Sequence, residues 1–585
     1  MTATVFWPLD CKLSGFCYGW SKPAICVAGV IQAQDATEAQ KVLDEFAKSP
    51  LKNLSKIRNH ELVLLGRCEP ENTITWMPSV HFDCLKSNYS IIFYHRHAPN
   101  SLRFHSLAVS SADESEALAI RSGYVLGGFT RQIRSESDGI DDTVVDQFNA
   151  AGSIDALLQP RRPLVRPLMS SAVHNLFWNL LGFIYATVSS VLAAVTRALG
   201  VVCNAPVFKF WNAGTSYQVL LKDVSATIQQ VDIRTEQANF LVSEVSSLKQ
   251  RTMPTSVYSM HYTNFFNNVW LILNDLTIGY AFGSFLCDNH LVLANFLSNA
   301  VDYILIDWVQ WVLRWLDSWP AGLKLNTELS QFYSHTFVDL IAMWGSVLHR
   351  GFPYLPAIIY VFGILSSLGG VIGGMTMSIS LFSDLLSLCT VHIYVCYVIA
   401  NTVYARVLST ARSLWNLFRG KRYNVLRNRT DSWEYDTDQL LFGTILFTLL
   451  AFLFPTVLAY YSLFALMRLA TILIQASLET QLAFMNHFPL FAIMLRVKDP
   501  WRLPGGIYFV FKISSAREDP TLIIENQAVP FSAIFFQYVR LWSRLATHYN
   551  PLRLLKCVFA GEFLAPIPRY EMRYDKPKAK GMQSR

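Results

Sequence analysis

The chain has 585 residues, of which 52% are hydrophobic and only 16% are charged, and its formal net charge is +7. Soluble globular domains carry about 25% charged residues, so this composition argues against an ordinary soluble enzyme and favours a membrane protein. The positive charge fits a protein that lies against an anionic membrane surface. It argues against a nucleic-acid-binding domain, because the cations do not form an isolated soluble face.

Ten cysteines are scattered along the chain, and no two of them form a C-x-x-C pair. No Cys/His cluster has the spacing of a zinc site, so the sequence predicts neither a metal site nor a bound cofactor. His95 and His97 invite a metal interpretation, but no third ligand lies at useful spacing. We therefore expect them in a solvated loop.

Residues 1–165 are predicted to form a soluble α+β domain. The apolar residues of Ala36–Lys48 recur with helical period, which predicts one amphipathic helix. Short runs rich in Val, Ile, Phe and Tyr predict strands at Ala24–Ile31, Glu61–Leu65, Ser90–Tyr94 and Arg103–Val109.

Residues 166–260 are predicted to hold the first membrane segment and an amphipathic arm. The apolar run His174–Val202 follows the basic stretch Arg161–Arg166, which places the preceding domain in the cytosol under the positive-inside rule. Tyr217–Leu248 has heptad-like apolar spacing. It is either a coiled-coil-like arm or a surface helix packed on its own protein.

Residues 261–500 are predicted to form a membrane domain with several spans. Asn264–Cys287 and Leu291–Leu316 are the weaker ones, because residues such as Asp275 and Asp302 interrupt them. Carboxylates at bilayer depth cost about 2.5–3.5 kcal/mol each, so these helices should face the helix bundle. The remaining predicted spans are the Gly-rich Pro353–Met375, which should pack closely, then Ser378–Val407, Leu440–Leu463 and a returning Phe464–Leu495.

The polar stretch 408–438 between these spans begins with cations and ends with carboxylates. A basic loop between spans resists translocation, and with about four crossings before it and two after it, it lies in the cytosol with both termini. The cations could contact phospholipid headgroups or an acidic face of a partner, or they could only fix the topology. The candidate contact residues are Arg419, Lys421, Arg422, Asn424, Arg427 and Arg429.

Residues 501–585 are predicted to be a small soluble cytosolic segment with a basic tail. Gly506–Ile513 and Thr521–Ile524 resemble a strand pair, and Phe531–His548 has the pattern of an amphipathic helix. The sequence as a whole therefore predicts a multi-pass α-helical membrane protein with an N-terminal soluble α+β domain. On this topology the sequon at Asn428 is cytosolic and should carry no glycan.

Asp436 and Asp438 are the one pair that could support chemistry of the chain's own. Two carboxylates separated by one residue can hold a divalent metal and, through it, a nucleotide-sugar diphosphate. Negative charge directly before a helix also simply favours the positive end of the helix dipole. The chain has no Gly-rich phosphate loop, G-x-S-x-G elbow or H-E-x-x-H motif, so no catalytic residue is predicted.

Three segments together are more specific than any short motif. W-P-A-G-L-K-L-N-T-E-L occupies 319–329, R-G-K-R-Y-N-V-L-R-N-R-T-D-S occupies 419–432, and D-Q-L-L-F-G-T-I-L-F-T-L-L occupies 438–450. In these segments the chain resembles the PIG-Q family, over roughly residues 260–500. That family is a membrane subunit of the complex that transfers N-acetylglucosamine to phosphatidylinositol, the first step of glycosylphosphatidylinositol-anchor synthesis.

The resemblance implies an endoplasmic-reticulum membrane protein that assembles or stabilises this complex on the cytosolic face. It implies that a PIG-A-like glycosyltransferase performs the catalysis, together with PIG-C-, PIG-H- and PIG-P-like subunits and the phospholipid membrane. In the first motif, a hydrogen-bonded turn or a subunit contact is expected of Trp319, Gly322, Lys324, Asn326 and Glu328.

Two other functions compete with this subunit role. One is a stand-alone membrane glycosyltransferase that uses Asp436 and Asp438 with a metal. The other is a transporter or channel, which is disfavoured because the spans show neither an inverted repeat nor a matched pair of broken helices.

Overall fold

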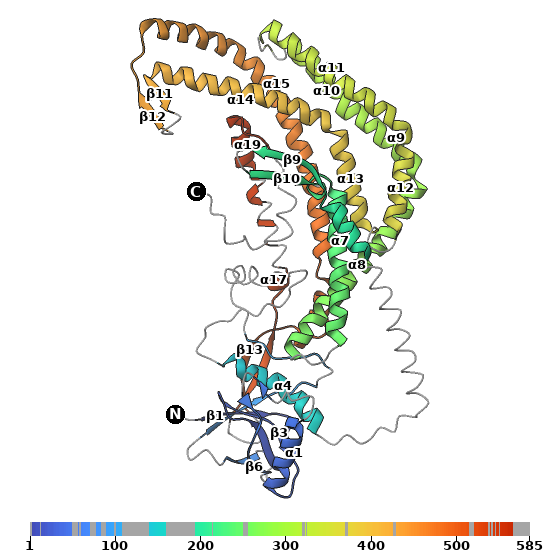
Figure 1. The fold of residues 1–585 in the computed structure, drawn as a ribbon, viewed down its shortest axis with the longest axis vertical. Helices are drawn as coiled ribbons and strands as arrows, with labels where there is room; N and C mark the ends of the chain where they lie inside the picture. Colours follow the sequence, from blue (N-terminus) through green and yellow to red (C-terminus); the bar gives the residue numbers. More distant parts are fainter. Residues whose placement is uncertain are drawn as a thin grey trace.

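The structure is a computed structural model, and it describes residues 3–11, 13–48, 56–57, 60–70, 78–82, 89–98, 101–107, 140–158, 194–212, 215–249, 255–318, 322, 325–368, 373–424, 429–513, 520–535, 539, 542–543, 546–548 and 550–564. An eight-stranded sheet forms one end of the molecule, and long helices extend from it towards the other end (Figure 1).

The sheet has the strand order β13–β14–β8–β1–β3–β2–β6–β7. β1 pairs in parallel with β3 and β8, whereas β2 pairs antiparallel with β3 and β6. Successive side chains of a strand point to opposite faces, and Val5 and Trp7 are accordingly buried in one apolar cluster while Phe6 is buried in another. The N-terminal strands are β1 (Ala3–Pro8), β2 (Gly15–Trp20), β3 (Ile25–Ile31), β6 (Val63–Pro70), β7 (Pro78–Phe82) and β8 (Tyr89–Tyr94).

Two helices belong to this sheet, α1 (Ala36–Lys48) and α4 (Asp142–Leu158). Phe148 of α4 stacks on Tyr94 with ring centroids 4.5 Å apart and meets the ring of Phe6 at 5.1 Å. The predictions for the strands at 24–31 and 90–94 and for the helix at 36–48 are confirmed.

The predicted strand Arg103–Val109 is wrong for the part that the structure describes, because residues 101–107 form no strand. The side chain of Asn149 replaces the ladder there. Its Oδ1 accepts the His105 backbone N–H at 2.6 Å, and its Nδ2 donates to the His105 carbonyl at 2.9 Å. These backbone groups are thus satisfied without a neighbouring strand.

The C-terminal part of the chain completes the same sheet. β13 (Pro504–Ile513) and β14 (Pro520–Ala528) form the predicted strand pair, and the pairing is antiparallel. β14 also pairs in parallel with β8, from Leu522 opposite Ile92 to Ile524 opposite Tyr94. The two ends of the chain, which the sequence analysis assigned to separate units, therefore share one sheet.

The helical region runs outward from the sheet and returns twice (Figure 1). α8, α9 and α10 lead outward and α11 and α12 lead back beside them, after which α13 and α14 lead outward and α15 leads back. The helices are α7 (Ala226–Lys249), α8 (Thr255–Asp288), α9 (His290–Val301), α10 (Trp308–Asp317), α11 (Thr327–Gly351), α12 (Leu355–Ser367), α13 (Met375–Cys389), α14 (Val391–Phe418), α15 (Thr437–His487) and α16 (Leu490–Lys498).

Short elements connect these helices. A π-helical turn, Asp302–Asp307, joins α9 to α10 and a 3-10 turn, Phe352–Tyr354, joins α11 to α12. The remaining elements are β4 (Lys56–Ile57), β5 (His60–Glu61), a helix at Ala194–Cys203, β9 (Pro206–Asn212), β10 (Thr215–Leu220), α6 (Leu221–Val224), β11 (Lys421–Asn424), β12 (Arg429–Ser432), a 3-10 turn Pro500–Arg502, α17 (Phe531–Ile534) and α19 (Pro551–Ala560).

Five helices in the described part of the chain are long and apolar enough to cross a membrane: His261–Asp288, His290–Asp317, Thr327–Ser367, Val391–Phe418 and Thr437–His487. This agrees with the prediction of a largely helical chain with membrane-length segments. The predicted first span, His174–Val202, lies outside the described residues up to position 193, and the helix Ala194–Cys203 covers its end.

Two predicted spans differ from the structure. Ser378–Val407 is not one helix, because α13 ends at Cys389 and α14 begins at Val391. The return at Phe464 is absent, because α15 is a single helix of 51 residues with Pro455 inside it. Residues 456–485 contain neither Gly nor Pro, so nothing in that stretch favours a turn.

Glycines bring α8 and α12 into close contact, as expected for Pro353–Met375. A Cβ added at Gly363 would lie 2.6 Å from the Cys287 Sγ and 2.8 Å from the Gly283 carbonyl oxygen. A side chain at this crossing would therefore force the two helices apart.

Candidate functional site

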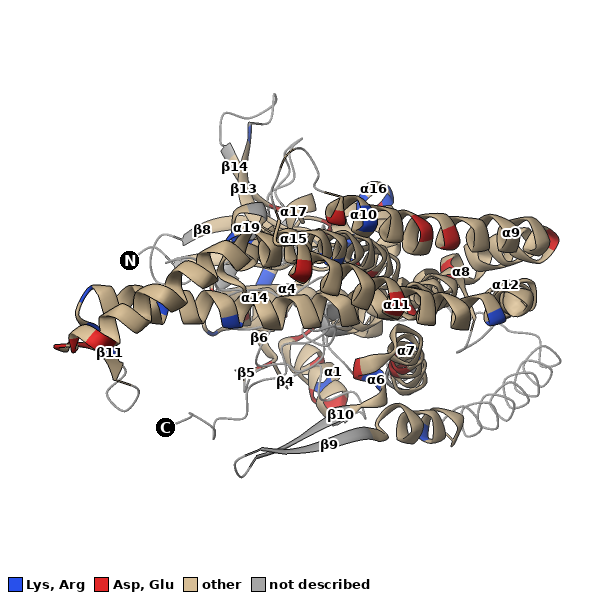
Figure 2. Cartoon of the chain, turned by 90° about the horizontal axis from the view of Figure 1, so that it is seen from above, with Lys and Arg blue, Asp and Glu red and all other residues tan. Residues whose placement is uncertain are grey.

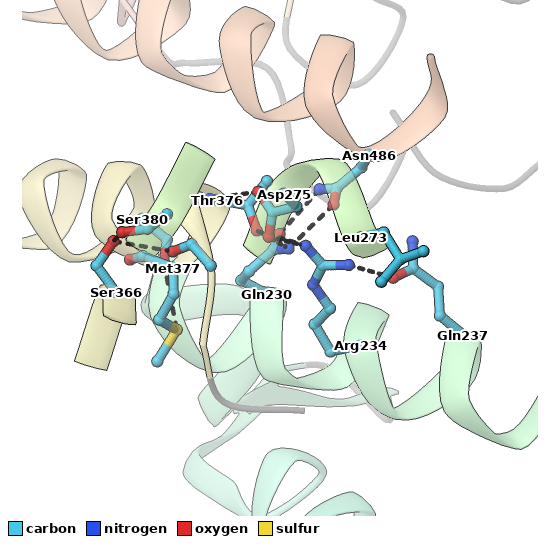
Figure 3. A network of polar contacts seen from close by, with 12 residues as sticks. Gln230, Arg234, Gln237, Leu273, Asp275, Ser366, Thr376, Met377, Ser380 and Asn486 are labelled. Carbon is cyan, nitrogen blue, oxygen red and sulfur yellow. Dashed lines mark hydrogen bonds and ion pairs between the residues drawn. The ribbon is translucent and has the colours of Figure 1, made fainter. Parts of the chain in front are cut away.

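A cluster of buried polar side chains lies where α7, α8, α13 and the end of α15 meet (Figure 3). We call Gln230, Arg234, Asp275, Thr376 and Asn486 the buried polar cluster. Each of these residues is at most 4% exposed. Polar groups that are removed from water must be paired, so the cluster has to be judged by its bonds.

Arg234 and Asp275 form the charged centre of the cluster. Nη2 of Arg234 donates to the Asp275 carboxylate and, at 2.9 Å, to Oγ1 of Thr376. The other Asp275 oxygen accepts the Thr376 backbone N–H at 2.9 Å, at the start of α13. A carboxylate is favoured at the positive end of a helix, so Asp275 joins α7, α8 and α13 at one point.

Amide side chains extend the cluster to α15. Gln230 donates from Nε2 to Asn486 Oδ1 at 3.0 Å, and Asn486 donates from Nδ2 to Gln230 Oε1 at 2.9 Å. The polar face of α7 is thus the buried one. Tyr217–Leu248 is therefore no exposed arm held by apolar heptads; within it α7 packs on its own protein through hydrogen bonds.

A second carboxylate holds the beginning of α7. Asp384 of α13 accepts the backbone N–H groups of Ala226 at 2.8 Å and Thr227 at 3.0 Å, and also the hydroxyl of Ser225 at 2.5 Å. Asp384 thus caps α7 from a neighbouring helix, as Asp275 does for α13. Asp275 could be predicted from the sequence to face the helix bundle, whereas Arg234 and Asp384 could not. The signal for Asp275 was a single carboxylate inside the largely apolar helix α8.

The turn before α11 is held on the middle of α15. Asn326 is the N-cap of α11, and its Oδ1 accepts the Leu329 backbone N–H at 3.0 Å. Its own backbone N–H donates to Thr456 Oγ1 at 2.9 Å, next to Pro455. Ser330 and Tyr460 are joined through their hydroxyl groups at 2.9 Å.

The rest of this predicted motif is only partly described. Gly322 has φ +77°, a left-handed conformation that favours glycine, and Glu328 lies exposed in the first turn of α11. Trp319 and Lys324 lie outside the described residues. Asn326 thus forms a hydrogen-bonded turn within the chain, and a subunit contact of this motif stays a prediction.

The basic segment forms a β-hairpin, β11–β12, at the end of the molecule opposite the sheet (Figure 1). α14 continues to Phe418, so the stretch predicted as a loop from 408 is helical in its first part. Arg419 follows α14, and Lys421, Arg422 and Asn424 lie on β11. Arg429 lies on β12, and Arg427 lies outside the described residues.

Contacts inside this hairpin order its charges. The Arg422 guanidinium lies 5.0 Å from the centroid of the Trp433 ring, and Arg429 pairs with Asp431 at 2.8 Å. Asn424 donates to the same carboxylate at 3.2 Å. Figure 2 shows that blue and red residues gather at β11, whereas the adjoining helices are mostly tan.

Asp436 and Asp438 lie at the beginning of α15. Asp436 occupies its N-cap position and Asp438 its first turn, and both are exposed. In the described part of the chain no group of three or more His, Cys, Asp or Glu side chains is placed to hold a metal ion. The arrangement favours the interaction with the helix dipole over a metal site.

The histidines near the sheet are not in a solvated loop as expected. The rings of His97 and His105 stack with centroids 4.7 Å apart, and both His95 and His97 meet Trp501 edge-on. Burial, reinforced by His105, His95 and Arg103, lowers the pKa of His97 to about 3. These histidines therefore join the sheet to the segment that follows α16.

Comparison with known proteins finds one family over this region. Residues 228–505 match the family described as "N-acetylglucosaminyl transferase component (Gpi1)". This range contains the buried polar cluster, the turn before α11, the hairpin β11–β12 and the whole of α15. It confirms the family resemblance drawn from the motifs at 319–329, 419–432 and 438–450.

Curated relatives agree with the family match. The chain is 37% identical over 60% of its length to the N-acetylglucosaminyl-phosphatidylinositol biosynthetic protein gpi1 of Schizosaccharomyces pombe, covering 54% of that protein. It is 33% identical over 58% of its length to the phosphatidylinositol N-acetylglucosaminyltransferase subunit GPI1 of Saccharomyces cerevisiae, covering 59%. It is 33% identical over 54% of its length to the human subunit Q, covering 39%.

The chain thus spans little more than half the length of the yeast relatives that it matches. No solved structure matches the chain.

Proposed function

Residues 228–505 of this chain belong to the Gpi1 family, and from that premise we propose that the protein is a non-catalytic subunit of a phosphatidylinositol N-acetylglucosaminyltransferase. Its role is to assemble or stabilise the complex that transfers N-acetylglucosamine from its UDP donor to phosphatidylinositol, the first step of glycosylphosphatidylinositol-anchor synthesis. The observation that carries this proposal is the family match together with its relatives, two of which are named as subunits of that enzyme.

The proposal includes a place and partners. The protein resides in the endoplasmic-reticulum membrane, with its sheet and both termini in the cytosol. The membrane domain, 261–500, holds a PIG-A-like catalytic glycosyltransferase and PIG-C-, PIG-H- and PIG-P-like subunits. Exposed apolar side chains support a location in a membrane or against partners. Phe296, Tyr303 and Phe452 are each about 70% exposed or more, and they need lipid or a partner to cover them.

The polar groups support a structural role. Asp275 and Asp384 each bind the start of a helix, and Arg234 pairs with Asp275. A glycosyltransferase site needs groups that are free to bind a nucleotide sugar. Asp436 and Asp438, the pair on which the competing enzyme function rests, lie exposed at the start of α15.

Co-purification and activity together test this proposal. The full chain, captured in mild detergent, should bring down a second polypeptide with a nucleotide-sugar domain, and transfer of N-acetylglucosamine to phosphatidylinositol should require that polypeptide. A chain that purifies as a clean monomer, or that turns over UDP-N-acetylglucosamine alone, would contradict the subunit role.

Substitution of both carboxylates separates the two functions. The double variant Asp436→Asn, Asp438→Asn should leave the activity of the assembled complex within about twofold, because neighbouring charges of a helix start contribute only about 0.3–1 kcal/mol. Glu434→Gln, an exposed acid of the same segment, is the matched control. Loss of activity by orders of magnitude in the double variant alone would favour the enzyme function.

A further inference from the structure

The continuity of α15 bears on where the basic hairpin β11–β12 lies relative to the sheet. α15 is a single helix from Thr437 to His487, and α16 and β13 follow it. β14 then pairs with β8, so the chain beyond α15 returns to the sheet that the N-terminal strands form. One helix therefore separates the hairpin from the sheet, where the sequence predicted two crossings.

The first part of α15 is suited to the interior of a bilayer. Between Leu441 and Phe452 its large apolar side chains are exposed around most of the helix, with Phe452 77% exposed. From Thr437 to Pro455 the helix rises by about 27 Å, at 1.5 Å per residue. The hydrocarbon core of a bilayer is about 30 Å thick, so this part alone nearly spans it.

The hairpin itself has the chemistry of the headgroup region. Tyr423 and Trp433 are each more than half exposed, as is Trp415 near the end of α14, and Arg422 lies over the Trp433 ring. Arg419 and Lys421 are exposed beside them. Aromatic rings and cations at the end of an apolar helix are typical of the membrane–water interface, where Arg and Lys contact lipid phosphates.

The other end of this apolar stretch carries a second amphipathic element. Hydroxyl groups of α14 and α15 hold α19: Tyr404 donates to the Phe559 carbonyl at 3.1 Å and Tyr461 to the Val558 carbonyl at 2.9 Å. The outer face of α19 exposes Leu552 and Phe559 together with Arg553 and Lys556. Such a helix suits the plane of a membrane surface.

The contacts of α19 lie at different distances from the hairpin along the two helices, and Tyr404 of α14 is 15 residues from Arg419, which is about 22 Å of helix. Tyr461 lies 24 residues beyond Thr437 along α15, which is about 36 Å of helix.

We propose that the basic hairpin, in its described residues 419–424 and 429–436, lies on the opposite side of the membrane from the sheet and contacts phospholipid headgroups of the far leaflet. The expectation of one common side rested on two crossings after the hairpin, and the structure has one helix there. Arg496, Lys498 and Arg502 follow α15 at its other end, so cations flank this helix on both sides and the proposal rests on the path of the chain, not on the charge rule.

Cysteine accessibility in sealed microsomes tests the side. Thr430→Cys lies exposed on β12 and Glu45→Cys lies exposed on α1 beside the sheet. With a membrane-impermeant maleimide, the cysteine at one of these two positions should react in intact vesicles, and the cysteine at the other position should react only after the membrane is permeabilised. The unsubstituted chain gives the background of the native cysteines, and Ser432→Cys serves as a second hairpin position if Thr430→Cys does not accumulate. Reaction of hairpin and sheet positions under the same condition would overturn the proposal.

Lipid contact has its own measurement. A fluorophore on Tyr423→Cys, in the full chain reconstituted into phosphatidylcholine vesicles, should be quenched by lipids that carry a nitroxide on the headgroup. The same fluorophore on Glu45→Cys should keep its intensity. Equal intensities with and without the nitroxide at position 423 would refute the headgroup contact.

Discussion

Removal of the Asp275 carboxylate should destabilise the helical region more than any exposed substitution. In Asp275→Ala, Arg234 stays buried with its side chain 4% exposed and loses its counter-ion. The Thr376 backbone N–H and hydroxyl lose the acceptors that they reach at 2.9 Å. Breaking a buried ion pair from one side costs about 3–5 kcal/mol, because a charge is left unpaired in a poorly solvated site.

Thermal unfolding in detergent measures this loss. For a cooperative unit of 150–250 residues, 1 kcal/mol corresponds to about 2–4 °C, so the midpoint should fall by roughly 6–20 °C. Asp275→Asn should lose less, because its amide oxygen can still accept the Thr376 N–H.

The pair substitution is the decisive control. Arg234→Met with Asp275→Leu replaces both charges with apolar side chains of similar length, and buried pairs replaced in this way are often neutral or stabilising. The double variant should therefore melt above either single one. If Asp275→Ala melts within a degree of the unsubstituted protein, or if the double variant is worse than both singles, the reasoning about this ion pair is wrong.

Three further substitutions test other contacts. Asn326→Ala should cost about 1 kcal/mol of stability because it removes the N-cap of α11, whereas Asn326→Asp should keep that cap. Equal melting midpoints for the two variants would show that the cap does not contribute to stability. Gly363→Ala should cost about 1–3 kcal/mol where α8 and α12 cross, whereas Gly351→Ala, which has open space, should not; similar losses would refute the close contact. Because burial lowers the pKa of His97 to about 3, the unfolded chain binds more protons than the folded one between that value and about 6.5. Stability should therefore fall by up to about 1.4 kcal/mol per pH unit on acidification through this window, and His97→Gln should flatten the midpoint-against-pH curve.

Helices of the membrane region could be predicted because their signal is local. A run of about 20 apolar residues identifies a membrane-length helix without knowledge of its neighbours, and the predicted spans at 264–287 and 291–316 follow from that rule. The positions at which these helices end could not be predicted as well. α15 runs through the position where a turn was expected, because its sequence from 456 to 485 offers no residue that favours one.

Pairings between distant residues could not be predicted from local pattern. β14 meets β8 with Ile524 opposite Tyr94, a separation of 430 residues, and no periodicity in either strand indicates its partner. The same holds for Arg234, whose partner lies 41 residues away on another helix. Asp275 could be expected to face the bundle because a charge in an apolar helix needs a partner, but the identity of the partner depends on the packing.

Apolar spacing was misleading for α7 for a physical reason. Heptad spacing predicts an apolar buried face, yet Gln230, Arg234 and Gln237 are buried in this helix alongside apolar residues such as Ile233. They are tolerated there because each finds a hydrogen-bond partner on its own helix or a neighbouring one. A polar helix can thus be internal wherever the surrounding helices supply polar groups at matching heights.

The arrangement of these bonds favours a protein that holds its shape over one that changes it. Asn326 fixes the turn before α11 to Thr456 in the middle of α15, and Asn486 fixes the end of the same helix to α7. α15 also begins at the basic hairpin, so a partner or lipid bound there acts on a helix that is tied at its middle and its end. Because a polar bond removed from water costs free energy when it is opened without replacement, the hairpin and the sheet should keep a fixed separation.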